Sequence, residues 1–336
     1  MSFADEQRQY QAEATPIPKA WFRLARNRIQ TGMSRHEFIR AIIREEGATL
    51  AQAEHVTDFI YGGARSATAF RRPAAACVER PVFTIPHEVF LQSLGHNHQN
   101  QFARLLGDHF GLTVANDLLS RFQIGTSSYW PGACVFWYID EEGRKRGGQI
   151  KLFDANFHTV KYLDASGVRR TKTNWVHSAY ARRCHELKVP YPPWLVDYLD
   201  EQHEVAKSPC LFGLPQLLNA PLDQPVAIVE SPKTAVLCSP YFPGFIWLAV
   251  GALSYLNASR LAPLRNRNVM LFPDLSTDGS AFDRWSRTAS ELTAQGFSVR
   301  VSDYLALRAT QAQQDAGFDL ADYLLGQWPG YPPNWD

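Results

Sequence analysis

The spacing of apolar and polar residues changes along the chain and predicts regions of different structure. Residues 1–75 carry apolar positions at helical intervals, which predicts a helical module. The apolar run 133–140 and the returning segment 149–154 flank a glycine-containing turn, which predicts a β-hairpin. Helices are expected between these two regions, at 86–94, 100–110 and 114–120.

From residue 216 onward, short β-branched runs alternate with helical stretches. The expected strands are 226–229, 245–250, 269–272 and 297–301, and the expected helices between them are 233–239, 257–264 and 282–295. Strands that alternate with helices form parallel sheets with right-handed crossovers. The pattern therefore predicts an α/β domain with a Rossmann-like parallel sheet.

Two of these strands run directly into an acidic residue. Val226-Ala-Ile-Val is followed by Glu230, and Asn268-Val-Met-Leu-Phe-Pro by Asp274. Ligands of open α/β sheets bind at the carboxyl ends of the strands. Two carboxylates at that edge predict a site for a hard divalent cation, Mg²⁺ or Mn²⁺.

Composition limits the function classes only weakly. The chain has 336 residues, 45% of them hydrophobic, and a formal net charge of +1. Its five cysteines are scattered without the paired spacing of a zinc ribbon, so no zinc is expected and a reducing cytoplasm is the expected compartment. The polar N-terminus and the lack of long apolar runs predict neither a signal peptide nor a membrane span.

Charge is uneven along the chain. Residues 141–190 contain eleven Lys or Arg against five Asp or Glu, a local net of +6, together with several aromatic residues. Basic and aromatic side chains together suit nucleic acid, since charges follow phosphates and rings stack on bases. A solvated basic face is the alternative of equal weight. The candidate nucleic-acid contacts are Arg144, Lys145, Arg146, Lys151, Arg169, Arg170, Lys172 and Trp175.

Several candidates for the site also have ordinary structural explanations. Lys233 lies in the first turn of an expected helix, where its charge opposes the helix dipole, which hints at a phosphate partner. Asp278 precedes a glycine, as in many turns. Asp319 and Asp322 could cap and begin a helix at 320–326.

These features together resemble the Toprim domain of topoisomerases and bacterial-type primases. Glu230 matches the family's strand-end glutamate, and Asp274 matches the first residue of its Asp-x-Asp motif. The segment Asp319-Leu-Ala-Asp322-Tyr-Leu resembles a further acidic motif of primase-like members. Residues 85–326 as a whole resemble the Toprim-containing, primase-like proteins of bacterial plasmids and conjugative elements.

The resemblance implies a domain plan and a site. It implies a helical module (1–75), a primase-like α+β region that binds nucleic acid (85–215), a Toprim domain (216–326) and a tail (327–336). Glu230, Asp274 and Lys233 would be catalytic. The implied metal ligands are Glu230, Asp274, Asp278, Asp319 and Asp322.

The chain departs from the family at two points. Ser276 stands where the second aspartate of Asp-x-Asp is expected, and no zinc ribbon precedes the primase-like region. Two functions therefore stay open. One is Mg²⁺-dependent phosphoryl or nucleotidyl transfer on nucleic acid, by a primase-like nucleotidyltransferase or nuclease. The other is a catalytically degenerate scaffold in plasmid maintenance, transfer or phage defence.

The same resemblance suggests the partners. Single-stranded DNA is the expected nucleic acid, nucleotides are candidate ligands, and a helicase or another replication protein is a candidate protein partner. No membrane partner is expected, and the bacterial cytoplasm is the expected location.

Overall fold

The computed structural model describes residues 41–42, 44–45, 82–200, 207, 210–252 and 255–333. The chain divides into two compact units, residues 1–78 and residues 79–336. The helices expected within residues 1–75 lie outside the described residues, four positions excepted. The features that follow all belong to the second unit.

The first half of this unit is built on an antiparallel sheet with the order β1-β2-β3-β6. Its strands are β1 (Gly125–Ser127), β2 (Ala133–Ile139), β3 (Lys145–Lys151) and β6 (Thr173–Trp175). The expected hairpin is present as β2 and β3, with β3 beginning earlier than predicted because the turn is short. Every residue of β2 is buried, so both faces of this sheet are covered.

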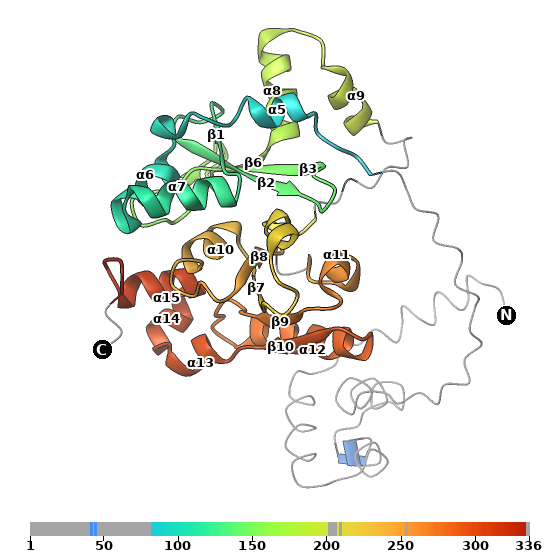
Figure 1. Cartoon of the computed structure of the whole chain (residues 1–336), viewed down its shortest axis with the longest axis vertical. Helices are drawn as coiled ribbons and strands as arrows, with labels where there is room; N and C mark the ends of the chain where they lie inside the picture. The colour runs from blue at the N-terminus through green and yellow to red at the C-terminus, as the bar shows by residue number, and fades with distance from the viewer. Residues whose placement is uncertain are drawn as a thin grey trace, which may run out of the picture. The chain divides into compact units, whose positions relative to one another are not determined.

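The two faces of β2 pack against different elements. Phe136 and Tyr138 belong to a core that also contains residues of β7 and α10, whereas Val135 and Trp137 belong to a separate core. Figure 1 shows α5 and α8 on one side of the sheet and α6 and α7 on the other. The helices of this half are α5 (His87–Leu91), α6 (Gln101–Phe110), α7 (Leu112–Arg121), α8 (Val176–Leu187) and α9 (Pro193–Leu199), with a 3₁₀ turn η1 (Asn97–Gln99).

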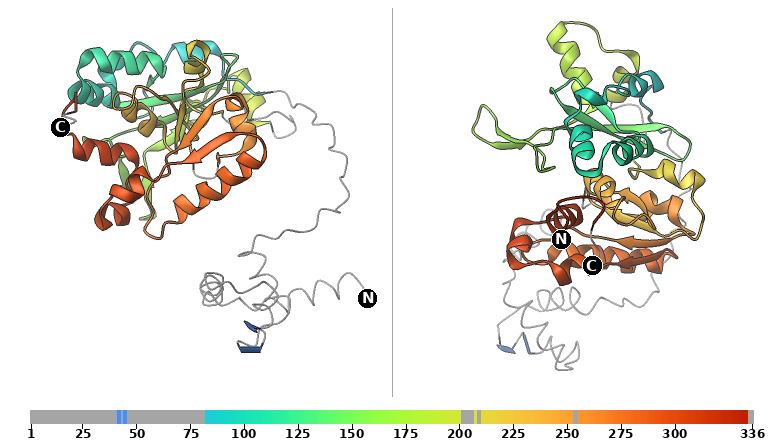
Figure 2. Two further views of the ribbon diagram at one scale, coloured as in Figure 1. Left: turned by 60° about the horizontal axis from the view of Figure 1, so that its bottom comes forward. Right: turned by 60° about the vertical axis from the view of Figure 1, so that its left-hand side comes forward.

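A small hairpin leaves this body between β3 and β6. It consists of β4 (Lys161–Leu163) and β5 (Arg169–Thr171), which pair only with each other. All six strand residues are exposed. The right-hand view of Figure 2 shows the hairpin extending away from the sheets.

The second half is the α/β domain expected from residue 216 onward. Its four strands are all parallel, in the order β10-β9-β7-β8: β7 (Val226–Val229), β8 (Ile246–Ala249), β9 (Asn268–Leu271) and β10 (Ser298–Val301). The predicted α/β class is therefore confirmed. The helices are α10 (Pro232–Cys238), α11 (Ala258–Leu261), α12 (Ser280–Ala294), α13 (Tyr304–Arg308), α14 (Gln311–Ala316) and α15 (Leu320–Gln327).

Differences from the expected elements have local causes. The single helix expected at 257–264 is a short α11 followed by the 3₁₀ turn η4 (Ala262–Leu264), because Pro263 has no amide hydrogen to continue the ladder. The segment Leu214–Asn219, before β7, is the 3₁₀ turn η2. Among the described helices, none has both the length and the apolar character needed to cross a membrane.

Candidate functional site

The carboxyl ends of β7 and β9 lie side by side, as the apolar runs predicted. The two strands are parallel neighbours, with Val226 opposite Val269 and Ile228 opposite Leu271. Glu230 follows the last residue of β7 directly, and Asp274 follows β9 after Phe272 and Pro273. Both acidic residues therefore leave the sheet at the same edge.

Asp274 occupies an environment that disfavours its charge. Its Oδ1 atom is buried and has no hydrogen-bond partner. Burial raises the pKa of this carboxyl well above its usual value, and the negative charges of Asp319 and Glu230 raise it further. The described structure thus leaves one buried carboxylate oxygen unsatisfied beside other acids, which is costly unless a cation or proton compensates it.

Lys233, in the first turn of α10, partly compensates the negative charge of these acids. Its Nζ atom lies 2.8 Å from Asp319 Oδ2 and 2.8 Å from Asp322 Oδ1, and its side chain is only 8% exposed. Burial alone would lower the pKa of Lys233, but the two carboxylates raise it above its ordinary value. Lys233 was expected to face a phosphate, but it lies between Asp319 and Asp322. A buried ammonium pairs with the nearest negative charges.

Asp319 and Asp322 both begin helix α15 and contact Lys233 of the site. Asp319 is the N-cap of α15, and the two residues form a reciprocal capping box. Asp319 Oδ2 also accepts a hydrogen bond of 2.6 Å from the hydroxyl of Thr234. Burial opposes ionisation of Asp319, but Lys233 and these hydrogen bonds lower its pKa below the usual value. This motif therefore joins α15 to α10.

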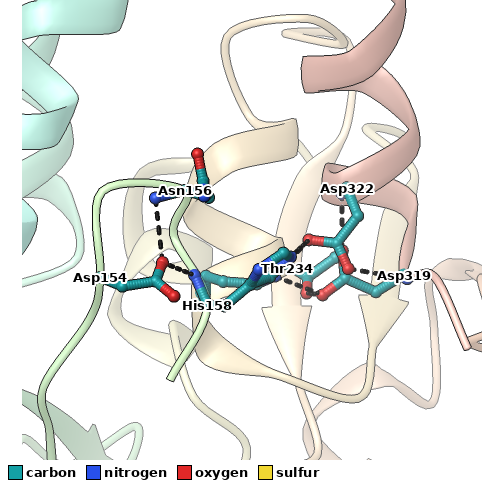
Figure 3. Close-up of polar contacts among 7 residues, drawn as sticks. Asp154, Asn156, His158, Thr234, Asp319 and Asp322 are labelled. Carbon is teal, nitrogen blue, oxygen red and sulfur yellow. Dashed lines mark hydrogen bonds and ion pairs between the residues drawn. The ribbon is translucent and has the colours of Figure 1, made fainter. Parts of the chain in front are cut away.

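A loop from the antiparallel half reaches the same cluster. In Figure 3, His158 lies between Asp154 and the carboxylates of Asp319 and Asp322. His158 Nε2 is 3.7 Å from Asp322 Oδ1. Asp154 Oδ1 fixes the loop by accepting backbone hydrogen bonds from Asn156 and His158, at 2.9 and 3.0 Å. His158 has no motif spacing, so sequence reasoning gave no signal for it.

Lys151 approaches the cluster from β3. It pairs with Cys134 across the hairpin, so it points to the same side of the sheet as Phe136 and Tyr138. Burial lowers the pKa of Lys151 and so does the charge of Lys233, while Asp319 and Glu230 oppose that shift. Among the described residues, its ammonium forms no ion pair or hydrogen bond. Among the predicted nucleic-acid contacts, Lys151 interacts electrostatically with Asp319 and Glu230 of the acidic cluster.

Asp278 and Ser276 serve the start of α12 instead. Asp278 is exposed, and its Oδ1 accepts a hydrogen bond from the backbone nitrogen of Ser280 at 3.0 Å. That contact with Ser280 lowers its pKa. Ser276 Oγ accepts from the backbone nitrogen of Ala281 at 3.1 Å. Asp319 and Asp322 raise the pKa of Asp274, whereas Asp278 is engaged at the start of α12.

The two arginines of the β2–β3 hairpin are paired with nearby acids. Arg144 Nε is 2.7 Å from Asp140 Oδ2, and its Nη2 is 2.8 Å from Glu142 Oε2. Arg146 Nη1 is 3.5 Å from the same Asp140 carboxylate, which is 2% exposed. Lys145 lies over the ring of Phe90, 4.9 Å from its centre. These contacts stabilise the turn. The role of these residues in binding nucleic acid stays a prediction.

The remaining basic candidates surround the projecting hairpin. Arg169 is exposed on β5, and Arg170 Nε is 2.9 Å from Asp164 Oδ2. Lys172 lies between the rings of Trp130 and Tyr162, at 5.5 and 5.8 Å from their centres. Trp175 is half-buried, 5.8 Å from the ring of Tyr138. The candidate set is therefore spread over the turn, the hairpin and the site.

The charges near the site fit a divalent cation. Four carboxylates, those of Glu230, Asp274, Asp319 and Asp322, act together with two lysines, Lys151 and Lys233. Ionised, this set has a net charge of −2. Lys233 engages Asp319 and Asp322. Glu230 and Asp274, which follow adjacent parallel strands, are the residues that would hold Mg²⁺. Magnesium in proteins commonly binds one or two carboxylates and completes its shell with water and phosphate oxygens. No described group of three or more His, Cys, Asp or Glu side chains is arranged to hold a metal.

Comparison with known families gives a match over half of the chain. The family model described as "Domain of unknown function (DUF6371)" matches residues 100–275, which include β2, β3, Glu230 and Asp274. No curated protein matches the sequence.

Comparison with solved structures gives distant likenesses. The primase fragment of the bacteriophage T7 primase-helicase protein is 14% identical, over 66% of this chain and 69% of its own, with a TM-score of 0.36. The DnaG catalytic core is 14% identical, over 71% and 83%, with a TM-score of 0.38. The DnaG primase catalytic domain bound to ssDNA is 15% identical, over 72% and 85%, with a TM-score of 0.38.

Proposed function

Because this chain belongs to the family described as domain of unknown function DUF6371, whose model covers 100–275 of its 336 residues, we propose its function from its own site. The proposal is phosphoryl or nucleotidyl transfer on nucleic acid, dependent on Mg²⁺ or Mn²⁺, by a primase-like enzyme. Single-stranded DNA is the proposed template or substrate.

One observation carries the proposal. Glu230 and Asp274 end adjacent parallel strands, and Asp274 Oδ1 is buried without a hydrogen-bond partner. A carboxylate left unsatisfied among other acids is costly in a purely structural role. It is useful where a divalent cation binds. The resemblance of the Glu230 and Asp274 segments to Toprim motifs supports the same chemistry.

Each residue has a distinct part in this proposal. When bound, the cation would neutralise charge on the reacting phosphate and lower the pKa of an attacking oxygen. Glu230 and Asp274 would hold it. Lys233 keeps Asp319 and Asp322 in place, so that α10 and α15 present a fixed wall to the site. Lys151, whose ammonium forms no ion pair among the described residues, is the candidate for binding a phosphate oxygen.

The test is incorporation of labelled nucleotides on single-stranded DNA, and cleavage of the same DNA, with Mg²⁺, with Mn²⁺ and with EDTA. Wild-type protein should be active only with a divalent cation. Glu230→Gln keeps the size of the side chain and should lose about two decades of rate or more. The matched control is Glu142→Gln, an exposed acid on the β2–β3 turn, which should keep wild-type rates.

A second function is favoured by a specific observation. Ser276 and Asp278, at the family's second aspartate motif, are engaged in capping α12, and Lys233 already neutralises two of the acids. A nucleic-acid-binding scaffold without catalysis would have such a site. Cation-independent binding of single-stranded DNA, with no synthesis or cleavage and no loss of affinity in Glu230→Gln, would favour the scaffold. Roles in plasmid maintenance, transfer or phage defence belong to this second proposal.

A further inference from the structure

A second concave site lies on the other face of the antiparallel sheet. It is a cavity of about 730 Å³ whose floor is formed by Val135, Trp137 and Ile150. Side chains alternate along a strand, so these residues point away from Lys151 and Phe136, which face the carboxylate cluster. Binding sites for small molecules commonly have volumes of about 300–1,000 Å³. The cavity is thus of ligand size and separate from the carboxylates.

One face of helix α8 forms a wall of this cavity. Val176, Ala179, Tyr180, Arg183 and Leu187 line it, at the three- and four-residue spacing that places side chains on one side of a helix. Val176 and Ala179 are buried, whereas Arg183 and Leu187 are exposed. The wall therefore changes from apolar at the sheet to charged at the mouth.

The floor of the cavity is apolar because its polar atoms are already paired. Trp137 Nε1 donates to Ser93 Oγ at 2.9 Å, and Ser93 Oγ donates to the carbonyl of Phe90 at 2.7 Å. The inner end therefore offers ring and aliphatic carbon. At the entrance, Tyr129 and Trp130 pack edge to face with ring centres 4.6 Å apart. A planar, apolar ligand group would find aromatic and aliphatic contacts on several sides.

The mouth carries an excess of positive charge. Arg182 Nε is 2.8 Å from Glu186 Oε1, and Arg182 Nη1 donates to the hydroxyl of Tyr129 at 3.2 Å, so the charge of Glu186 is matched. Arg183, one residue further on, forms no hydrogen bond or ion pair among the described residues. Ser127 and Ser128 line the same cavity, and Ser127 Oγ accepts a hydrogen bond from the backbone nitrogen of Tyr129 at 3.2 Å. An anion entering here would meet the uncommitted guanidinium of Arg183.

We propose that this cavity binds a phosphorylated nucleoside, with the base toward Trp137 and Val176 and the phosphate at Arg183. A ligand with a planar ring at one end, whose faces pack on apolar side chains, and an anion at the other end matches the gradient from the floor to the mouth. Arginine suits phosphate because its planar donors contact two oxygens together. The same chemistry is offered by a free mononucleotide and by the phosphorylated end of an oligonucleotide. The site lies outside the proposed catalytic centre and does not depend on its activity.

The test is calorimetric titration of the full chain in EDTA, so that no divalent cation contributes. The probes are AMP, ribose 5-phosphate and a 5′-phosphorylated dinucleotide. AMP should bind with a Kd below roughly 1 mM, and ribose 5-phosphate, which lacks the base, should bind at least about tenfold more weakly. Binding of the dinucleotide with the higher affinity would identify a nucleic-acid end as the source, and binding of AMP with the higher affinity a free nucleotide.

Matched variants locate the binding. Arg183→Glu reverses the charge at the mouth and should weaken AMP binding by about tenfold to a hundredfold, as expected for loss of a charged hydrogen bond. Arg300→Glu reverses an exposed arginine on β10, outside the cavity and outside the candidate nucleic-acid contacts, and should leave the affinity within about twofold. Glu230→Gln should also leave it unchanged, whether or not the carboxylate site is catalytic.

Three results would overturn the proposal. One is the absence of AMP and dinucleotide binding at concentrations of several millimolar. Another is binding that is lost in Glu230→Gln and kept in Arg183→Glu, because the nucleotide would then occupy the carboxylate site. Equal affinity for ribose 5-phosphate and AMP would also contradict it, since the apolar floor would then contribute nothing.

Discussion

At the scale of a single residue, Lys233 neutralises two of the carboxylates of the site. Its two contacts, both 2.8 Å, satisfy Asp319 and Asp322 at the same time. Removing one member of a buried ion cluster leaves the others unpaired, which costs more than the pair contributes. Lys233 is therefore a structural requirement of the cluster, whatever it does toward a substrate.

Lys233→Met should lower the free energy of unfolding by about 3–5 kcal/mol, since two carboxylates lose their cation. The matched control is Lys161→Met, an exposed lysine on β4, which should change stability by less than about 0.5 kcal/mol. Urea denaturation followed by circular dichroism measures both. Equal stability of the two variants would mean that the ion cluster is not formed in solution.

Replacing Asp274 should raise the stability of the protein, in contrast to replacing Lys233. Without metal, Asp274→Asn removes a charge from a buried position beside Asp319 and Glu230, so it should stabilise the protein. The expected gain is about 1–3 kcal/mol at pH 7 in EDTA, the usual penalty of an unsatisfied buried group. Thermal unfolding in EDTA measures it. A loss of stability would show that Asp274 makes a favourable contact absent from the described structure.

At the scale of the elements, the packing of α8 on β3 depends on Gly148. A Cβ atom at Gly148 would lie 2.7 Å from Val176 Cγ2 and 3.0 Å from the ring of Trp137. Gly148→Ala should therefore destabilise the protein by about 1–3 kcal/mol through overpacking. The control is Gly326→Ala, an exposed position in α15 with nothing within 4 Å, which should gain about 0.5–1 kcal/mol. Chemical denaturation distinguishes the two, and a neutral Gly148→Ala would contradict this packing.

Sequence reasoning identified elements where the periodicity was strong. The apolar run of β7 and the acid after it were predicted, because a buried parallel strand has a continuous signal. Helix α8 and the β4–β5 hairpin were missed, since α8 has a polar sequence with few apolar positions and the hairpin strands are short and exposed. The ion pairs of Lys233 with Asp319 and Asp322 were also missed. Lys233 and Asp322 are 89 residues apart, and a contact at that separation leaves no local sequence pattern.

At the scale of the whole described unit, the antiparallel sheet separates two candidate sites. One face, through Lys151, meets the carboxylates that follow β7 and β9, and the other face forms the floor of the nucleotide-sized cavity. The net charge of +1 conceals this arrangement, since acids cluster at one site and an uncommitted arginine lies at the other. The location of each charge therefore says more about function than the total.

The proposed function depends on a divalent cation held by Glu230 and Asp274. The most direct measurement is a titration of the metal-free protein with Mn²⁺, in which electron paramagnetic resonance counts the bound ions. We expect one bound Mn²⁺ ion per chain, displaced by Mg²⁺, in wild-type protein and in the control Glu142→Gln. We expect none in Glu230→Gln combined with Asp274→Asn. Full binding by that double variant, or no binding by the wild type, would contradict the proposed function.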